Sequence, residues 1–120
     1  MNWISPHTNI HIDHHTAVPG YGGVVAVLPT LCRGQGGVDA PAVERLGREL
    51  GNAGCHGIFV LGSTGELALL DDADRQTLIA AARRGTSNRT TLYAGISGHG
   101  PKHAIRLAHM AAEEGADAAV

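Results

Sequence analysis

The chain has 120 residues, enough for one small domain, and its formal net charge is −2 with the histidines neutral. Because nucleic acids and anionic membranes bind basic surfaces, this charge gives no support to either as a partner. Aromatic residues make up only 3% of the chain, which also argues against a stacking platform for single-stranded nucleic acid.

Residues 1–22 contain no basic segment followed by an apolar one, so they do not read as a signal peptide. They form a polar extension that carries four histidines, His7, His11, His14 and His15. Imidazole can bind a transition metal, but no cysteine or glutamate completes a ligand set here. We therefore expect a poorly ordered extension without a metal site, and a metal-binding leader is the alternative.

The two cysteines, Cys32 and Cys55, are too few for a disulfide scaffold and do not form a C-x-x-C pair. No apolar run approaches the roughly 18 residues that a membrane-spanning helix needs. We therefore expect a cytoplasmic protein with reduced thiols and no membrane partner.

Three apolar runs of strand length, at residues 24–28, 57–61 and 91–94, predict three β-strands. The run at residues 24–28 is continuously apolar rather than alternating, as in a strand of a parallel sheet that is buried on both faces. Residues 116–120 read as the opening of a fourth strand.

A helix pattern follows each of the three runs. Asp39 and Asp71 are predicted N-caps of the first two helices, and Pro101 fits the first position of the third. Apolar residues at helical spacing predict the buried faces. These are Val43, Leu46 and Leu50 in the first helix, Leu78, Ile79 and Ala82 in the second, and Ile105, Ala108 and Ala112 in the third.

This alternation of strands and helices predicts an α/β fold with a parallel sheet and right-handed crossovers. The sequence stops as it enters the fourth strand, where a natural domain seldom ends, because an unpaired sheet edge would result. We therefore expect a partial domain at residues 23–120.

The turn at residues 62–66, Gly-Ser-Thr-Gly-Glu, is the main candidate site. It follows the second predicted strand, at the carboxyl end where α/β folds carry their chemistry. It is not a nucleophile elbow, which would need glycine where Leu61 stands, nor a phosphate-binding or dinucleotide-binding loop. Its hydroxyls and amides suit a small carboxylate. Composition leaves equally open the alternative that Ser63 and Thr64 only cap the next turn.

Other polar residues are weaker candidates. Glu66 fits an exposed or helix-capping acid better than a base, and His99 and His103 could face the site from a helix start. Lys102 is the only lysine, but its place in a first helical turn predicts a solvated amine rather than a Schiff-base nucleophile. Asp117, at the start of the fourth strand, is expected to be structural.

The G-[ST]-T-G-E turn is the most specific of several segments that occur here in a familiar order. The matching segments are residues 23–28, 37–39, 54–57, 60–66, 70–75, 93–96, 104–108 and 111–117. Together they resemble the dihydrodipicolinate synthase / N-acetylneuraminate lyase family, over residues 23–120.

The resemblance implies the N-terminal part of a (β/α)8 TIM barrel, about three βα units plus the start of a fourth strand. It implies a lyase or aldolase that acts on pyruvate or a related 2-oxo acid through a Schiff base, without a cofactor and as a homo-oligomer. By resemblance, Ser63 takes part in a proton relay with tyrosines. Thr64 binds the substrate carboxylate, together with Ser63, Gly65 and neighbouring amides.

The chain departs from the family pattern in two respects. Its first strand ends Pro29-Thr30 instead of Thr-Pro, which leaves the role of Thr30 open. The family's Schiff-base lysine and tyrosines belong to later strands, and neither Tyr21 nor Tyr93 stands in a tyrosine position. We therefore expect the 120 residues alone to be inactive. The alternative function is a non-catalytic truncated half-barrel that self-associates through open sheet edges.

Overall fold

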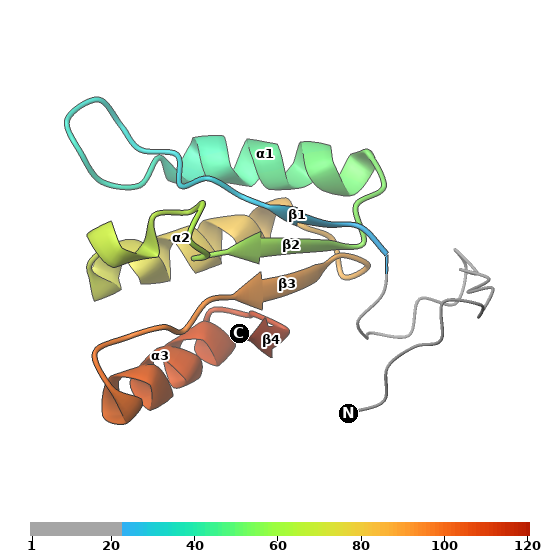
Figure 1. Ribbon diagram of the computed structural model, residues 1–120. Coiled ribbons are helices and arrows are strands. Elements are labelled where there is room, and N and C mark those ends of the chain that lie inside the picture. The colour runs from blue at the N-terminus through green and yellow to red at the C-terminus, as the bar shows by residue number, and fades with distance from the viewer. Residues whose placement is uncertain (1–22) are drawn as a thin grey trace, which may run out of the picture.

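The computed structural model describes residues 23–120, which form three strand–helix units and a fourth strand (Figure 1). The histidine-bearing leader at residues 1–22 lies outside the described residues. The strands are β1 (Val25–Val27), β2 (Gly57–Val60), β3 (Thr91–Ala94) and β4 (Ala118–Ala119). The helices are α1 (Ala40–Asn52), α2 (Asp72–Gly85) and α3 (Pro101–Glu113), with a short 3-10 helix, η1 (Leu67–Leu69), before α2.

The strands pair in parallel in the order β1-β2-β3-β4. Figure 1 shows α2 behind the sheet, with α1 above it and α3 below it. The sheet positions that point toward the helices are completely buried: Ile58, Val60, Leu92 and Ala94. On the other side of the sheet, Val25 and Val27 are 39% and 46% exposed. The sheet therefore has one face covered by helices and one open apolar face.

The helix starts follow the local chemistry of the sequence. The carboxylate of Asp39 accepts a hydrogen bond from the amide of Ala42 at 3.1 Å, which satisfies an amide that has no partner inside α1. Asp71 does the same for the amide of Asp74 in α2, at 2.8 Å. Pro101 occupies the first turn of α3. The three predicted helix starts are confirmed.

The buried face of α3 differs from the prediction. Leu107 and Ala111 are buried, whereas Ile105 is 59% exposed, so the predicted stripe of Ile105, Ala108 and Ala112 is wrong. Two residues along an α-helix correspond to about 200° of rotation, so Ile105 and Leu107 cannot both face the sheet. The face that carries Leu107 joins the core, and the predicted stripe is turned away from it. Among residues 23–120, no helix has the length and apolarity to cross a membrane.

Candidate functional site

The candidate site begins where β2 ends. Leu61 has a φ of 62° and turns the backbone out of the strand. The strand therefore ends at Val60, whereas the sequence predicted Leu61 as its last residue. Two hydrogen bonds of 3.0 Å then fold the turn. The amide of Gly65 donates to the carbonyl of Gly62, and the amide of Glu66 donates to the carbonyl of Ser63. Glu66 also has a positive φ, 53°, where the turn ends.

These two hydrogen bonds aim two other amides outward. In a trans peptide unit, the C=O and the N–H point in opposite directions. The carbonyl of Gly62 accepts inside the turn, so the N–H of Ser63, in the same peptide unit, points away from it. The carbonyl of Ser63 accepts in the same way and therefore turns the N–H of Thr64 outward.

Ser63 and Thr64 offer their donors to solvent. Both residues are exposed, and within residues 23–120 neither their amides nor their hydroxyls bond to a protein group. The following helix η1 has Glu66 as its N-cap and no side-chain cap, so the alternative that these hydroxyls cap the next turn is wrong. Their N–H and O–H groups remain available for a small anion such as a carboxylate.

Gly65 is held by the segment that follows β1. The residue is buried, and a Cβ here would lie 3.2 Å from the carbonyl oxygen of Leu28. The hydroxyl of Thr30 donates to the carbonyl of Gly65 at 2.6 Å. Since the amide of Gly65 already bonds within the turn, it has no free N–H for a ligand. Gly65 thus shapes the turn, and its place among the substrate-binding residues stays a prediction.

Arg75, from α2, holds the chain on the far side of the turn. The residue is only 5% exposed. The guanidinium donates to the carbonyls of Leu67 and Leu70, at 2.9 Å and 3.1 Å, and to that of Ser97, at 3.0 Å. Within residues 23–120 it forms no ion pair. Arg75 therefore ties the segment after β2 to the loop after β3.

Comparison with known proteins identifies the family. A sequence model described as the Dihydrodipicolinate synthetase family matches residues 20–120. The chain belongs to this family. The predicted resemblance is thus confirmed.

Two curated relatives show how much of a family member the chain represents. The enzyme named 4-hydroxy-tetrahydrodipicolinate synthase 1 in Streptomyces coelicolor is 32% identical over 97 residues, which are 81% of this chain and 32% of the relative. The synthase of Mycolicibacterium paratuberculosis is 32% identical over 95 residues, which are 79% of this chain and 32% of the relative. The chain therefore spans about a third of the length of these relatives.

Solved structures of family members give the fold. Dihydrodipicolinate synthase from Agrobacterium tumefaciens is 35% identical, with a TM-score of 0.75, over 81% of this chain and 33% of its own. A prophage protein of the family from Escherichia coli K12, solved in complex with pyruvate, is 29% identical, with a TM-score of 0.75 over the same shares. The predicted fold is confirmed: the described residues are the N-terminal part of a TIM barrel, with three βα units and the start of a fourth strand.

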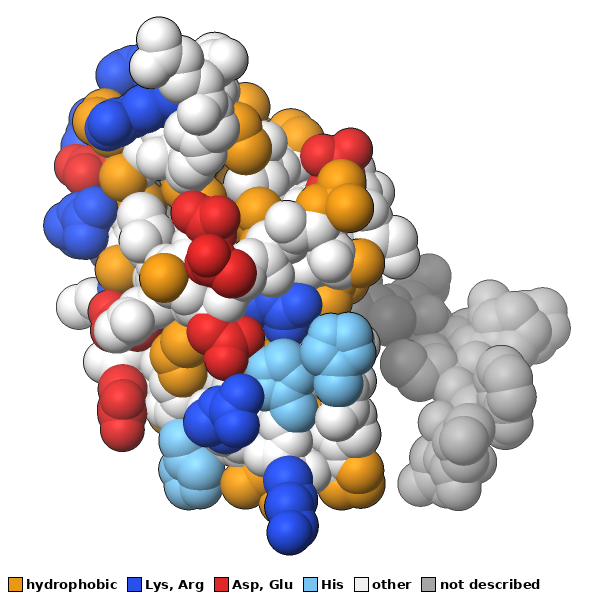
Figure 2. Space-filling view, turned by 90° about the vertical axis from the view of Figure 1, so that its left-hand side faces the viewer, with side chains coloured by type: hydrophobic (Ala, Val, Ile, Leu, Met, Phe, Trp, Pro, Cys, Tyr) orange, Lys and Arg blue, Asp and Glu red, His pale blue; other side chains and the backbone are white. Residues whose placement is uncertain are grey.

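The two histidines predicted at the start of α3 contact each other and α2. The rings of His99 and His103 stack with their centroids 5.6 Å apart. Nδ1 of His103 accepts from the amide of His99 at 3.0 Å, so the ring proton is on Nε2, which lies 3.0 Å from a carboxylate oxygen of Asp72. Figure 2 shows histidines gathered beside acidic and basic side chains at this end of the molecule. Both ring nitrogens of His103 thus have partners away from the turn.

Asp72 is the acidic member of this cluster. The hydrogen bond from His103, followed by the hydrogen bond and charge of Arg106, holds the pKa of Asp72 below its usual value, although some burial opposes the shift. Arg106 lies 3.2 Å from the second carboxylate oxygen. The cluster therefore joins the N-terminal ends of α2 and α3 and keeps a negative charge on Asp72.

Lys102 and Glu66 are both exposed. Lys102 lies in the first turn of α3, as predicted for a solvated amine. In residues 23–120, no group of three or more histidine, cysteine, aspartate or glutamate side chains could hold a metal ion.

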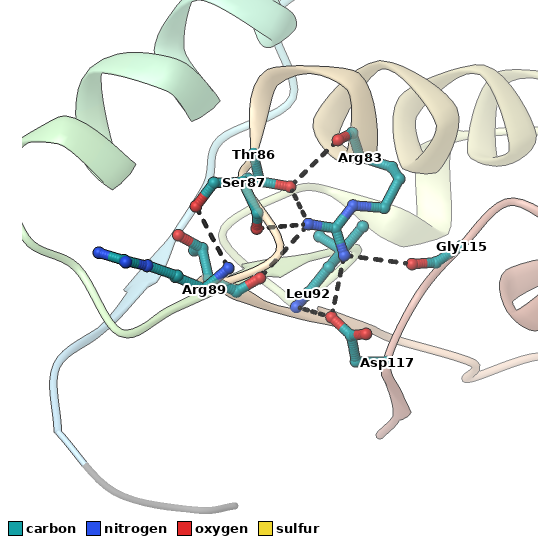
Figure 3. A network of polar contacts seen from close by, with 8 residues as sticks. Arg83, Thr86, Ser87, Arg89, Leu92, Gly115 and Asp117 are labelled. Carbon is teal, nitrogen blue, oxygen red and sulfur yellow. Dashed lines mark hydrogen bonds and ion pairs between the residues drawn. The ribbon is translucent and has the colours of Figure 1, made fainter. Parts of the chain in front are cut away.

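Asp117 has the structural role that was predicted for it (Figure 3). One of its carboxylate oxygens accepts from Arg83 at 3.0 Å and from the amide of Leu92 at 2.8 Å. Arg83 also donates to the Thr86 hydroxyl and to the carbonyls of Ser87, Thr90 and Gly115. This network joins the end of α2 to the starts of β3 and β4, at the opposite end of the strands from the turn.

Proposed function

We propose that the turn at residues 62–66 is the carboxylate-binding wall of a dihydrodipicolinate-synthase-like lyase that acts on pyruvate or a related 2-oxo acid. The observation that carries the proposal is the set of donors on Ser63 and Thr64, at the carboxyl end of β2, which bond to no group within residues 23–120. Pyruvate carries a carboxylate, and preorganised N–H and O–H donors stabilise such a group without reorganising. A relative solved in complex with pyruvate supports this choice of ligand.

The proposed chemistry is carbon–carbon bond formation or cleavage through a Schiff base. In this reaction a lysine amine condenses with the keto carbon of the 2-oxo acid and releases water. Thr64 would bind the carboxylate, and Ser63 would pass a proton between the substrate and tyrosines contributed by later strands. The one lysine of this chain, Lys102, is solvent-exposed on α3, so we propose that it is not the nucleophile and that the chain alone does not catalyse.

Amide NMR spectra of the chain, recorded during a pyruvate titration, test the carboxylate wall. We expect saturable shifts at the amides of Ser63 and Thr64, and no such shifts with methyl pyruvate, which lacks the charge. Thr64→Val should weaken binding about fivefold, the effect of one lost hydrogen bond of roughly 1 kcal/mol. Shifts confined to other residues would contradict the proposal.

Borohydride trapping with labelled pyruvate tests the missing nucleophile separately. We expect no covalent adduct on the chain, since reduction captures only a Schiff base that has formed. An adduct that disappears in Lys102→Arg would show that Lys102 is the nucleophile and overturn this part of the proposal.

A second candidate function is self-association as a non-catalytic half-barrel. It is favoured by the open apolar face, where Val25 and Val27 are 39% and 46% exposed, and by the single hydrogen-bonded neighbour of β1 and of β4 within residues 23–120. Sedimentation at several concentrations tests it. A species that stays monomeric throughout would exclude it, and Val27→Lys should shift any association toward monomer.

A further inference from the structure

Thr30 makes a contact that the proposed function does not use. Its hydroxyl donates to the carbonyl of Gly65 at 2.6 Å, across 35 positions of sequence. Within residues 23–120, this is the one side-chain hydrogen bond that reaches residues 61–66. Among the side chains of the described residues, only Thr30 therefore holds the turn by a hydrogen bond.

The bond acts on the peptide unit between Gly65 and Glu66. The C=O of this unit accepts from Thr30, and its N–H donates to the carbonyl of Ser63. Rotating the unit by about 180° would break both hydrogen bonds, because the C=O and the N–H point in opposite directions.

The same rotation would relieve an unfavourable backbone conformation. Glu66 has a φ of 53°, in the left-handed region that a residue with a Cβ disfavours. A flip of the preceding peptide unit would carry this φ to a negative value. The turn thus contains a conformation that tends to relax, and the hydroxyl of Thr30 opposes the relaxation.

A flip of this peptide unit would also affect the Thr64 amide, one of the donors of the proposed site. The carbonyl of Ser63 accepts from Glu66, and its own peptide unit carries the N–H of Thr64. If Glu66 turned away, nothing in the turn would fix the direction of the Thr64 amide. We infer that Thr30 is a positioning residue, whose hydroxyl holds the Gly65–Glu66 peptide unit so that Thr64 presents its N–H to a carboxylate. The inference rests on the proposed function of the turn.

Replacing the hydroxyl tests the inference. Thr30→Val exchanges the hydroxyl for a methyl group of similar size, and we expect pyruvate binding, followed at the Ser63 and Thr64 amides, to weaken about fivefold to tenfold. Thr30→Ser keeps the hydroxyl and should bind as the unaltered chain does. Thr77→Val is the matched control, because the Thr77 hydroxyl donates to a backbone carbonyl in α2, away from the turn, at 2.9 Å.

Glycine at position 66 separates positioning from packing. Glycine adopts positive φ without steric cost, so the turn no longer contains the strain that the hydroxyl opposes. We expect Thr30→Val combined with Glu66→Gly to recover most of the pyruvate binding that Thr30→Val loses. A role of Thr30 in packing alone would leave the double variant as weak as Thr30→Val, and that result would overturn the inference.

The outcomes distinguish the inference from the function on which it rests. If pyruvate does not shift Ser63 and Thr64 in the unaltered chain, the proposed function fails. If pyruvate binds equally well to Thr30→Val, only the inference fails. Hydrogen exchange of the unaltered chain adds a measurement that needs no variant: the Glu66 amide should exchange more slowly than that of Thr64, and equal rates would overturn the inference.

Discussion

The carbonyl oxygen of Leu61 lies directly against the Cα of Gly95, so that a Cβ at Gly95 would overlap it. Leu61 is itself buried and has a φ of 62°. The amide of Gly95 donates to the carbonyl of Val60 at 2.9 Å, so both backbones are fixed at the point of contact. No flexible side chain lies between them that could give way. The turn after β2 is therefore built directly on the end of β3.

Gly95→Ala should strongly destabilise the fold. The added methyl group meets backbone rather than a movable side chain, so we expect a loss of about 2–4 kcal/mol in the free energy of unfolding. Urea denaturation measures it. Gly34→Ala is the matched control, since no other atom of residues 23–120 lies within 4 Å of the Cβ position at Gly34, and its effect should stay within about 0.5 kcal/mol. Similar losses in both variants would contradict the tight contact at Gly95.

Arg75→Met should loosen both segments that Arg75 connects. The substitution keeps much of the buried stem but leaves three backbone carbonyls without their donor, and we expect a loss of about 2–4 kcal/mol. Hydrogen exchange should accelerate in residues 61–70 and 95–100 more than in α1. Arg48→Met, which removes an ion pair on a side chain that is 54% exposed, should cost less than about 0.5 kcal/mol. Uniform acceleration across the chain would argue against a local role for Arg75.

The sequence predicts the elements of this fold well because they depend on local signals. The strand predicted at residues 91–94 matches β3, and Asp39 and Asp71 both cap helices as expected. The rotation of α3 is harder to predict. Ile105 and Leu107 are both apolar in an alanine-rich helix, so spacing alone does not decide which of them faces the sheet.

In the candidate site too, the sequence predicts features that depend on neighbouring residues and misses contacts between distant ones. The turn motif locates Ser63 and Thr64, but the contact between Thr30 and Gly65 joins positions 35 residues apart and has no local signal. Arg75 did have one. It lies three residues before Leu78 and four before Ile79, and this spacing places it on the buried stripe of α2.

Arg83→Met should destabilise the amino ends of β3 and β4. It removes the donor to Asp117, to the Thr86 hydroxyl and to three carbonyls, and we expect a loss of about 2 kcal/mol by urea denaturation. A double-mutant cycle with Asp117→Asn isolates the ion pair. Since the Asp117 side chain is 48% exposed, the coupling should be below about 1 kcal/mol. A larger coupling would mean that the charge, rather than the hydrogen bonds to carbonyls, dominates this network.

Asp72 should contribute stability that disappears in acid. Its pKa is lowered in the folded chain by the hydrogen bond from His103 and by Arg106, so folding favours the carboxylate form. The contribution is fully present above the ordinary aspartate pKa of about 3.9 and is lost as the pH falls through the lower folded value. Urea denaturation of the chain and of Asp72→Asn, repeated from about pH 7 to about pH 3, should show a difference in the free energy of unfolding that shrinks at the acidic end.

Asp74→Asn is the control, because Asp74 lies in the same helical turn and its carboxylate has no partner within residues 23–120. A difference for Asp72→Asn that stays constant down to pH 3, or one that Asp74→Asn reproduces, would show that the contacts with His103 and Arg106 do not stabilise the carboxylate.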